Sequence, residues 1–534
     1  MQVRQAKKTP LSQVVLMFYN CLPYPVDIPK PRTLTHGVDS MMIRSLTRFA
    51  LIAALSLTAG TAMAQHDVGG GAAGGGAAGG GDSGRSTPAR RTVRRPPTTR
   101  RTTAPPRRDA TAEQYNAQGN DFFKAENYED ALDAYTKAVA LKPIASAYYH
   151  IGWIYNDRDD YDSALPALQQ SVRLDPTDAV VQHELGYSYR NLKQYSEALN
   201  AFRRAIQLRS DYATPYYEIG WIYNDQAQYA QAVEPLQRAA SLKENYADAY
   251  EELGYAYNKL NRSQEAIAAY QNAIRIKPDY GLALVGLGDV YYYQTKQYQQ
   301  AMEAYSKGVQ YKDDNPTAFY NLAWCANELN RFSDAASAAR RAIALKANYP
   351  EAYAELGFAN RKLNSPNDAI TAYQTAIRLK PGYGIAYTGL GDVYFVDLKQ
   401  YQQSIAPYEQ AIQISPNNAR VHYNLGWVYN DQSRFAEAAT QLNEAVRLKP
   451  EYVEAHTELG FALFKLHRLP AATEELRTAV RLKNDHATAH LYLGFVYIEQ
   501  KNRQGAQAEY AILRRLDPAK AQQLYDAAPA NMRN

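Results

Sequence analysis

The chain has 534 residues and a formal net charge of +5, and this charge is distributed unevenly. Residues 1–64 carry +5, residues 85–108 carry +9, and residues 109–534 carry −7. A basic segment therefore precedes a mildly acidic body, and the two should attract different partners. The only cysteines, Cys21 and Cys325, lie on opposite sides of the processing site predicted below, which excludes a disulfide framework in the mature chain.

Residues 41–64 have the three parts of a secretory signal peptide. Two arginines precede an apolar run at 49–59, and small residues continue to Ala64. This pattern predicts cleavage between Ala64 and Gln65. The run is shorter than the roughly 20 residues that cross a bilayer, so we expect a periplasmic or secreted product without a membrane span after processing. Retention of the segment as an anchor is the alternative.

Forty residues precede this signal segment and show neither a helical nor a strand period. Signal peptides begin within a few residues of the amino terminus. We therefore hypothesise that translation starts at Met41 or Met42 and that residues 1–40 are a non-native extension. Peptide mapping that recovered residues 1–40 from cells would contradict this hypothesis.

Residues 65–111 have the composition of a disordered linker. A glycine and alanine tract at 69–81 cannot bury a core, and the arginine and proline segment at 85–108 favours extended polyproline II. One interpretation is a solvated spacer, and the other is a tail that binds an anionic polymer or nucleic acid. The segment lacks aromatic rings that would stack on bases, which weakens the nucleic-acid version. The arginines of this predicted polyanion tail include Arg90, Arg91, Arg94, Arg95, Arg100, Arg101, Arg107 and Arg108.

A residue pattern recurs from Ala112 onward with a period close to 34. It has an aromatic residue at position 4, glycine at 8, tyrosine at 11, alanine at 20, an aromatic residue or leucine at 24 and proline at 32. Small residues at 8 and 20 let two helices approach closely, so each repeat is predicted to be an antiparallel helix pair. Position 8 is occupied by Gly119, Gly152, Gly186, Gly220, Gly254, Gly288, Ala323, Gly357, Gly391, Gly426, Gly460 and Gly494.

This pattern resembles that of the tetratricopeptide-repeat (TPR) family. The resemblance covers residues 112–520 as twelve repeats, and residues 521–534 are left as a capping tail. It implies an all-α, right-handed superhelical solenoid of about twelve helix-turn-helix repeats that binds a protein or peptide on its concave surface. A single helix pair cannot bury its apolar side, so neighbouring repeats must stack.

A second period of 103 residues groups the repeats in threes. The string GLGDVYYYQTKQYQQ at 286–300 returns as GLGDVYFVDLKQYQQ at 389–403, and each copy contains one inserted residue. This indicates that a block of three repeats was duplicated. Similar chemistry should therefore recur once in each block.

Positions 2, 5, 9, 12 and 13 of the first helix lie about 130° around the helix from the residues that pack the pair. In the TPR family this side lines the concave surface. Aromatic rings there supply contact area, Asn amides pair with the backbone of an extended peptide, and Asp holds a cationic residue. The predicted groove residues are Trp153, Asn156, Asp157, Tyr187, Trp221, Asn224, Asp225, Tyr255, Trp324, Asn327, Phe358, Trp427, Asn430 and Asp431.

Two further interpretations concern the same residues. Each tryptophan at position 9 can instead fill space between adjacent first helices, and the Asn-Asp pairs can close those helices. In addition, the arginine-rich segment at 85–108 carries the groups that stack on aromatic rings and pair with carboxylates, so it can occupy the groove until a partner displaces it.

The sequence shows no catalytic or metal-binding motif. His422, His456 and His490 are 34 residues apart at position 4, so the repeat register explains them as packing residues. His486 precedes His490 by four residues, but no Cys or carboxylate set converges with them. We expect no enzyme activity, cofactor, metal or small-molecule substrate.

The predicted function is thus an exported scaffold that binds an extended peptide or protein in its groove. Two alternatives belong to other classes. One is a polyanion- or nucleic-acid-associated protein that acts through the arginine tail, and its binding should fall steeply with salt. The other is a structural subunit of an envelope polysaccharide or secretion assembly.

Overall fold

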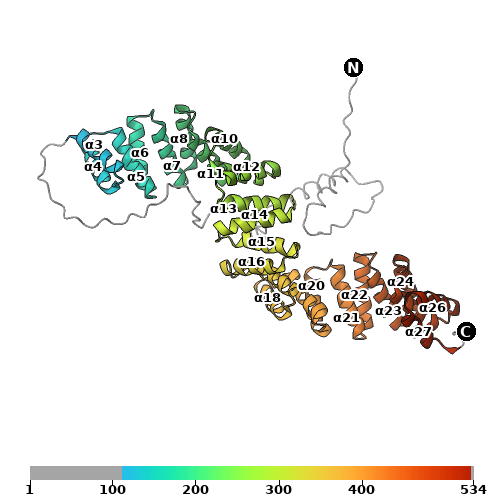
Figure 1. Cartoon of the computed structure of the whole chain (residues 1–534). Helices are drawn as coiled ribbons and strands as arrows, with labels where there is room; N and C mark the ends of the chain where they lie inside the picture. Colours follow the sequence, from blue (N-terminus) through green and yellow to red (C-terminus); the bar gives the residue numbers. More distant parts are fainter. Residues whose placement is uncertain (1–110, 531–534) are drawn as a thin grey trace, which may run out of the picture. The chain divides into compact units, whose positions relative to one another are not determined.

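The computed structural model describes residues 111–530, which form twelve pairs of α-helices followed by one more helix (Figure 1). No strand occurs among these residues. The predicted all-α repeat fold is confirmed. The predictions for residues 1–110, including the cleavage site at Ala64 and the arginine tail, lie outside the described residues.

The chain divides between Lys346 and Ala347 into two compact units, each built of stacked helix pairs. The unit that ends at Lys346 holds repeats 1–7. Its first helices are α3 (Ala112–Lys124), α5 (Ala145–Asp157), α7 (Ala179–Asn191), α9 (Ala213–Asp225), α11 (Ala247–Lys259), α13 (Gly281–Asp289) and α15 (Pro316–Glu328). Its second helices are α4 (Tyr128–Leu141), α6 (Tyr161–Leu174), α8 (Tyr195–Leu208), α10 (Tyr229–Leu242), α12 (Ser263–Ile276), α14 (Tyr298–Tyr311) and α16 (Phe332–Leu345).

The unit that begins at Ala347 holds repeats 8–12. Its first helices are α17 (Pro350–Lys362), α19 (Gly384–Asp392), α21 (Ala419–Asp431), α23 (Val453–Lys465) and α25 (Ala487–Glu499). Its second helices are α18 (Pro366–Leu379), α20 (Tyr401–Ile414), α22 (Phe435–Leu448), α24 (Leu469–Leu482) and α26 (Arg503–Leu516), and α27 (Pro518–Ala527) follows the last pair.

Helix pairing depends on the glycine at position 8, which lies directly against the large side chain at position 24. A Cβ atom built on Gly460 would lie 2.4 Å from Cγ of Leu476, closer than two carbon atoms can approach. The backbone of the first helix therefore rests on that side chain. The same contact joins Gly119 to Tyr135, Gly152 to Leu168, Gly186 to Phe202, Gly220 to Leu236, Gly254 to Tyr270, Gly288 to Tyr305, Gly357 to Tyr373, Gly391 to Tyr408 and Gly426 to Leu442.

Two repeats satisfy this contact in other ways. Repeat 7 has Ala323 at position 8, and the opposing residue at position 24 is Ala339, so a smaller partner makes room for the added methyl group; both are fully buried. In repeat 12 the side chain against Gly494 is Leu524 of α27, which a Cβ on that glycine would meet at 2.5 Å. The last helix thus covers the end of the final pair.

The turn within each helix pair contains one residue in the left-handed conformation, at position 15. All twelve such residues have φ between 54° and 59°, and none is glycine. In repeat 1 the N–H of Glu126 donates to the carbonyl of Phe123, and the N–H of Asn127 donates to that of Phe122. These bonds close the C-terminus of the first helix. Because this conformation is unfavourable for residues with a Cβ, helix packing rather than local preference holds the turn.

The inserted residues of repeats 6 and 9 are absorbed as π-helical turns. α13 ends at Asp289 and continues as η1 (Val290–Gln294), and α19 ends at Asp392 and continues as η2 (Val393–Asp397). The closing bonds run from Thr295 N–H to the Val290 carbonyl and from Leu398 N–H to the Val393 carbonyl. One wider turn thus accommodates each extra residue immediately after position 9, and π turns of this kind are common at functional sites.

The position-4 histidines of repeats 10–12 are buried within their helix pairs. The Nδ1 atom of His456 contacts Glu475 at 2.6 Å, and Nε2 contacts the Pro450 carbonyl at 2.9 Å. Burial disfavours the charged ring, but the bonds to these two acceptors raise the pKa of His456 above its usual value. His490 has a raised pKa for the same reasons, with Glu509 and the Asn484 carbonyl as acceptors.

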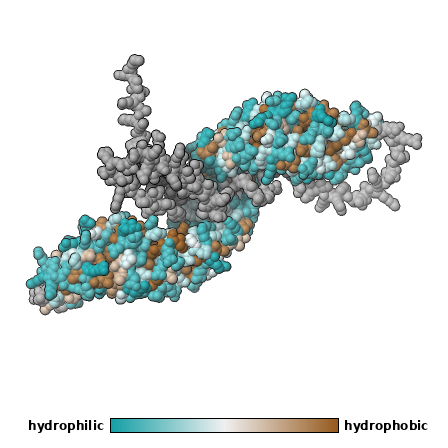
Figure 2. All heavy atoms as spheres, turned by 180° about the vertical axis from the view of Figure 1, so that it is seen from behind, coloured by the Kyte–Doolittle hydropathy of each residue, from teal (hydrophilic) through white to brown (hydrophobic). Residues whose placement is uncertain are grey.

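The surface is largely hydrophilic on the face seen in Figure 2, with hydrophobic residues scattered among polar ones. Several exposed apolar side chains end the second helices, among them Leu141, Leu174 and Leu482. Single exposed residues of this kind are ordinary for a folded protein. Within residues 111–530, no helix combines the length and the apolar character that crossing a bilayer requires.

Replacing Gly460 by Ala should destabilise repeat 11 by about 1–3 kcal/mol, the usual effect of overpacking. Adding Leu476→Ala should relieve the clash, as the alanine pair of repeat 7 does, so the double variant should be more stable than the two single effects predict. Urea unfolding followed by circular dichroism measures each change. Gly382→Ala is the control, because a Cβ there meets nothing within 4 Å. Strictly additive effects would contradict this packing.

The charged histidines should make repeats 11 and 12 sensitive to pH. A raised folded-state pKa contributes stability fully below the unfolded value of about 6.5, and the contribution is lost as pH rises through the folded pKa. The thermal midpoint should therefore fall between pH 6 and pH 9, and Glu475→Gln with Glu509→Gln should flatten this slope. In repeat 10, His422 already contacts a glutamine, Gln441, at 2.8 Å. Both variants create the same histidine–glutamine contact. An unchanged slope would show that the two ion pairs do not contribute.

Candidate functional site

The tryptophans at position 9 are half-buried against the preceding repeat. The Trp153 ring lies 5.0 Å from the Phe123 ring and 5.6 Å from the Tyr128 ring. One side of the indole thus fills space against the preceding repeat, as the packing interpretation predicts. Each ring also keeps part of its surface accessible to solvent. Trp324 contacts Tyr292 and Tyr298, and Trp427 contacts Phe395 and Tyr401, all with centroid separations of 4.9 to 5.4 Å.

Trp221 lies against a buried ion pair instead of an aromatic pair. The guanidinium carbon of Arg190 lies 4.5 Å from the Trp221 ring centroid and 5.0 Å from that of Tyr187. Arg190 also forms an ion pair with the buried Glu218. The predicted groove residues Tyr187 and Trp221 therefore enclose a cation supplied by the chain itself.

The asparagines at position 12 are buried and engage the following repeat. The Asn156 amide donates to the Glu184 carboxylate at 3.0 Å, and the Asn224 amide donates to the Glu252 carboxylate at 2.8 Å. Each also donates to the main-chain carbonyl of its glutamate. The donors predicted to pair with a peptide are thus already used between helices. Asn430 bonds to Glu458 in the same way, and Asn327 is buried as well.

The position-13 carboxylates differ among repeats. Asp157 and Asp431 are exposed, whereas Asp225 is half-buried and accepts a hydrogen bond from the Tyr195 hydroxyl at 2.5 Å. Within residues 111–530, no hydrogen bond or ion pair engages Asp157 or Asp431. These two carboxylates lie one helical turn after Trp153 and Trp427 on the same helix face.

The other two predicted aromatic residues carry a lysine one turn later. Lys259 Nζ lies 5.3 Å from the centroid of the half-buried Tyr255 ring, and Lys362 Nζ lies 5.5 Å from that of Phe358. The sequence predicts aromatic and acidic groups along the face, and the structure adds a basic group in repeats 5 and 8. The face is therefore mixed in charge rather than uniformly acidic.

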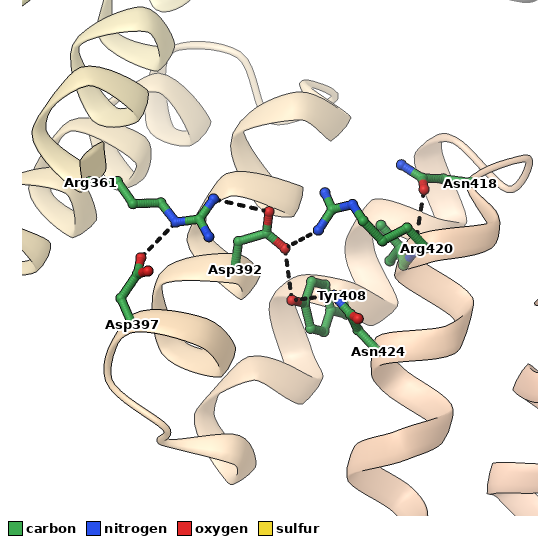
Figure 3. Close-up of polar contacts among 8 residues, drawn as sticks. Arg361, Asp392, Asp397, Tyr408, Asn418, Arg420 and Asn424 are labelled. Carbon is green, nitrogen blue, oxygen red and sulfur yellow. Dashed lines mark hydrogen bonds and ion pairs between the residues drawn. The ribbon is translucent and has the colours of Figure 1, made fainter. Parts of the chain in front are cut away.

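A group of polar side chains that the sequence did not predict as a site surrounds each π turn. Asp392 is buried at position 9 of repeat 9 and binds Arg420 at 2.7 Å, Arg361 at 3.3 Å and the Tyr408 hydroxyl at 2.8 Å (Figure 3). Arg361 also pairs with Asp397 at 2.6 Å. In Figure 3 both guanidinium groups point at the same carboxylate from opposite sides. Two arginines of the chain therefore balance the buried Asp392 carboxylate, and one of them is shared with Asp397.

Asp289 occupies the same position in repeat 6 but has different neighbours. It accepts a hydrogen bond from the Tyr305 hydroxyl at 2.6 Å, and Asn321 donates to that hydroxyl at 3.1 Å. Burial raises the pKa of Asp289 to about 7. Repeats 6 and 9 each contain one inserted residue, and this insertion marks both sites in the sequence.

Glutamates at position 6 form a second group that the sequence reading did not single out. Burial raises the pKa of Glu252 to about 7, although the bond from Asn224 opposes the shift, and burial also raises the pKa of Glu458. Their recurrence at one position was visible in the sequence. The role of these glutamates could not be predicted from the sequence, because the asparagine that binds each of them belongs to the preceding repeat.

Three family models match the chain over much of its length. The model described as "TPR repeat" matches residues 186–226, 254–294, 395–433 and 427–467. Two models described as "Tetratricopeptide repeat" match residues 116–179 and 285–352, and residues 213–246 and 350–383. Among curated proteins, no match was found.

Several solved structures resemble the chain. The crystal structure of MamA is 27% identical, covering 32% of this chain and 92% of that one with a TM-score of 0.30. Cut9 in the APC/C hetero-tetramer Cut9-Hcn1 is 16% identical, covering 79% and 97% with a TM-score of 0.35. Yeast Tom70 is 16% identical, covering 79% and 93% with a TM-score of 0.30.

The family matches fall on the helix pairs described above. This protein is a member of the tetratricopeptide-repeat family, a scaffold fold for protein–protein interaction.

Proposed function

We propose that this chain is an exported, non-enzymatic scaffold that binds an extended segment of a partner protein across the face formed by positions 2, 5, 9, 12 and 13. One observation carries the proposal: Trp153 with Asp157, and Trp427 with Asp431, each place a half-exposed indole one turn from an exposed carboxylate with no partner among the described residues. Such a pair presents aromatic contact area and an ionic anchor together. Neither group is needed within its own helix pair.

The binding role divides unevenly among the predicted residues. Asn156, Asn224 and Asn430 support it indirectly, because they fix the spacing of adjacent first helices through their glutamate partners. The exposed edges of the tryptophans and the carboxylates of Asp157 and Asp431 are the groups open to a ligand. The ligand chemistry that fits them is a cationic residue beside an apolar one.

Export is the second part of the proposal, and the signal-like segment at 41–64 supports it. The mature protein purified from its native cell should begin at Gln65, as measured by amino-terminal sequencing. A mature product that still contained residues 41–64 in a soluble cytoplasmic fraction would contradict export.

Charge reversal at the open carboxylates should disrupt partner binding. The double variant Asp157→Lys/Asp431→Lys should lose most of the proximity labelling that the wild-type chain gives in its native cell, because it repels a cationic ligand residue without removing a packed side chain. The matched control is Asp162→Lys/Glu474→Lys, which reverses two exposed acids on the second helices.

Both double variants change the net charge equally, so a general charge effect would alter labelling in both. The proposal expects labelled proteins to disappear only with the first variant. Equal labelling by the wild type and by Asp157→Lys/Asp431→Lys would refute the assigned binding face. Circular dichroism of each variant checks that the helical fold is retained.

A further inference from the structure

The four repeats that contain tryptophan share a row of three residues along the first helix. Positions 5, 9 and 13 are each four residues apart, so their side chains lie on one face of that helix. In these repeats the three positions hold a tyrosine, a tryptophan and an acid, and no other repeat has this combination. We name this row the Tyr-Trp-acid stripe. Its copies are Tyr149, Trp153 and Asp157; Tyr217, Trp221 and Asp225; Tyr320, Trp324 and Glu328; and Tyr423, Trp427 and Asp431.

The stripe of repeat 2 is open to a ligand. Tyr149 and Trp153 are half-buried, and the Asp157 carboxylate is exposed. Among the described residues no hydrogen bond or ion pair engages Asp157, and the neighbouring Arg158 pairs with Glu129 at 3.1 Å instead. The stripe therefore presents two aromatic edges beside a carboxylate that no cation in residues 111–530 neutralises.

The stripe of repeat 4 is satisfied within the chain. The guanidinium carbon of Arg190 lies 4.5 Å from the Trp221 ring centroid, and the Tyr195 hydroxyl donates to Asp225 at 2.5 Å. This copy shows which groups the stripe accepts, namely a guanidinium group beside the ring and a hydrogen-bond donor at the acid. In repeat 2 the position that corresponds to Arg190 holds Phe123, so the chain supplies no such cation there.

Segments in the polyproline II conformation are ligands that aromatic-lined faces bind. Such a segment is extended before it binds, so it loses little conformational entropy, and its proline rings pack on aromatic side chains. The Asp157 carboxylate lies one helical turn after Trp153 and adds a site for an arginine next to the prolines. The open stripe thus fits an extended segment in which arginine adjoins proline.

The chain contains such a sequence shortly before its first helix. Residues 94–97 read Arg-Arg-Pro-Pro and belong to the basic segment 85–108, which carries +9 against −7 for residues 109–534. This segment lies outside the described residues. It ends three residues before Thr111, the N-cap of α3, and repeat 2 is the nearest repeat with a Tyr-Trp-acid stripe. Both charge and position along the chain therefore favour this segment as the occupant.

The length of the chain selects which arginines reach the stripe. The Asp157 carboxylate lies roughly 20 Å from the start of α3, since it is about 18 Å along α5 and one helix spacing of about 8–10 Å across. Polyproline II rises about 3.1 Å per residue, so the 16 residues from Arg95 to Thr111 span about 50 Å. The four residues from Arg107 to Thr111 span only about 12 Å, so Arg107 and Arg108 fall short.

We infer that residues 94–97 of this chain occupy the stripe of repeat 2, with the prolines against Tyr149 and Trp153 and an arginine paired with Asp157. The inference rests on the proposed binding function and adds its regulation, because the chain itself covers part of the binding face until a partner displaces the segment. A tether of this length holds the segment at an effective concentration in roughly the millimolar range, which is sufficient for a contact of modest affinity.

A peptide competition tests this contact in the full-length chain. The probe is a dye-labelled, end-blocked peptide of residues 92–99, Thr-Val-Arg-Arg-Pro-Pro-Thr-Thr, and its fluorescence anisotropy gives the dissociation constant. In the wild-type chain the probe competes with the tethered copy. Arg94→Gln/Arg95→Gln frees the stripe and should bind the probe at least tenfold more tightly, as expected when a millimolar tether competes with a peptide that binds at about 0.1 mM.

A matched control lies in the same segment. Arg107→Gln/Arg108→Gln removes the same charge, but these arginines do not reach Asp157, so this variant should bind the probe as the wild type does. Adding Asp157→Lys to Arg94→Gln/Arg95→Gln should weaken probe binding at least tenfold. Adding Asp162→Lys instead, which reverses an exposed acid on α6 of the same repeat, should leave probe binding unchanged.

A second probe tests the proline contacts. Alanine replaces both prolines, which keeps the charge and removes the rings that pack on Tyr149 and Trp153. This probe should bind Arg94→Gln/Arg95→Gln at least fivefold more weakly than the first probe. Equal binding of the two probes would overturn the assignment of the segment to the aromatic stripe.

Sedimentation distinguishes the chain's own segment from that of a second copy. The wild type and Arg94→Gln/Arg95→Gln should have the same mass in solution, because the contact lies within one chain. A dimer of the wild type that this variant dissociates would show that the segment occupies a second copy, and would overturn the intramolecular contact.

Equal probe affinity of the wild type and Arg94→Gln/Arg95→Gln would rule out the inference, and so would an equal gain in Arg107→Gln/Arg108→Gln. The proposed binding function is tested separately by partner labelling with Asp157→Lys/Asp431→Lys. Loss of labelling there, without a difference between the tail variants here, removes only the internal contact. Probe binding that depends on Asp157, together with unchanged labelling, keeps the internal contact and removes the proposed partner site.

Discussion

The whole array depends on one steric constraint, the absence of a side chain at position 8 opposite a large one at position 24. With a Cβ at Gly152, for example, Leu168 would have to move by about an ångström or more, and the two helices would separate. Repeat 7 meets the same constraint with Ala323 and Ala339, which shows that the summed size of the two partners matters rather than glycine itself. The position-9 and position-12 residues take no part in this contact and instead join neighbouring repeats.

The repeat fold could be predicted from sequence because its determinants recur at fixed spacing. A single glycine carries little information, whereas twelve small residues in register leave few alternatives. The turn geometry was not predictable in the same way. Residues as different as Glu126, Ala227 and Lys399 adopt the left-handed conformation at position 15, so no residue type signals it. The π turns were visible only as two repeats that are one residue longer, and sequence spacing does not say where a helix absorbs an extra residue.

The candidate site was predictable by position but not by partner. Helical geometry predicts that the tryptophans share one side of the first helices, and each of them packs against the preceding repeat. It could not show that the Asn224 amide is used by Glu252, because that bond joins neighbouring repeats 28 residues apart. The sequence likewise does not show that the buried Asp289 carboxylate accepts a hydrogen bond from Tyr305, 16 residues later. The side-chain contacts between neighbouring repeats depend on how the repeats stack. The periodicity predicts that the repeats stack, but it does not show which side chains meet.

Duplication followed by divergence explains why one scaffold holds two electrostatically different sites. A buried carboxylate is tolerated only when a proton or a cation neutralises it. At Asp392 the chain supplies two arginines that neutralise the carboxylate. At Asp289 the corresponding positions are Asn258 and Thr317, and the carboxyl instead holds its proton up to a pH of about 7. The first copy thus keeps the aspartate, the tyrosine and the π turn, and a proton takes the place of the two cations in neutralising the carboxyl.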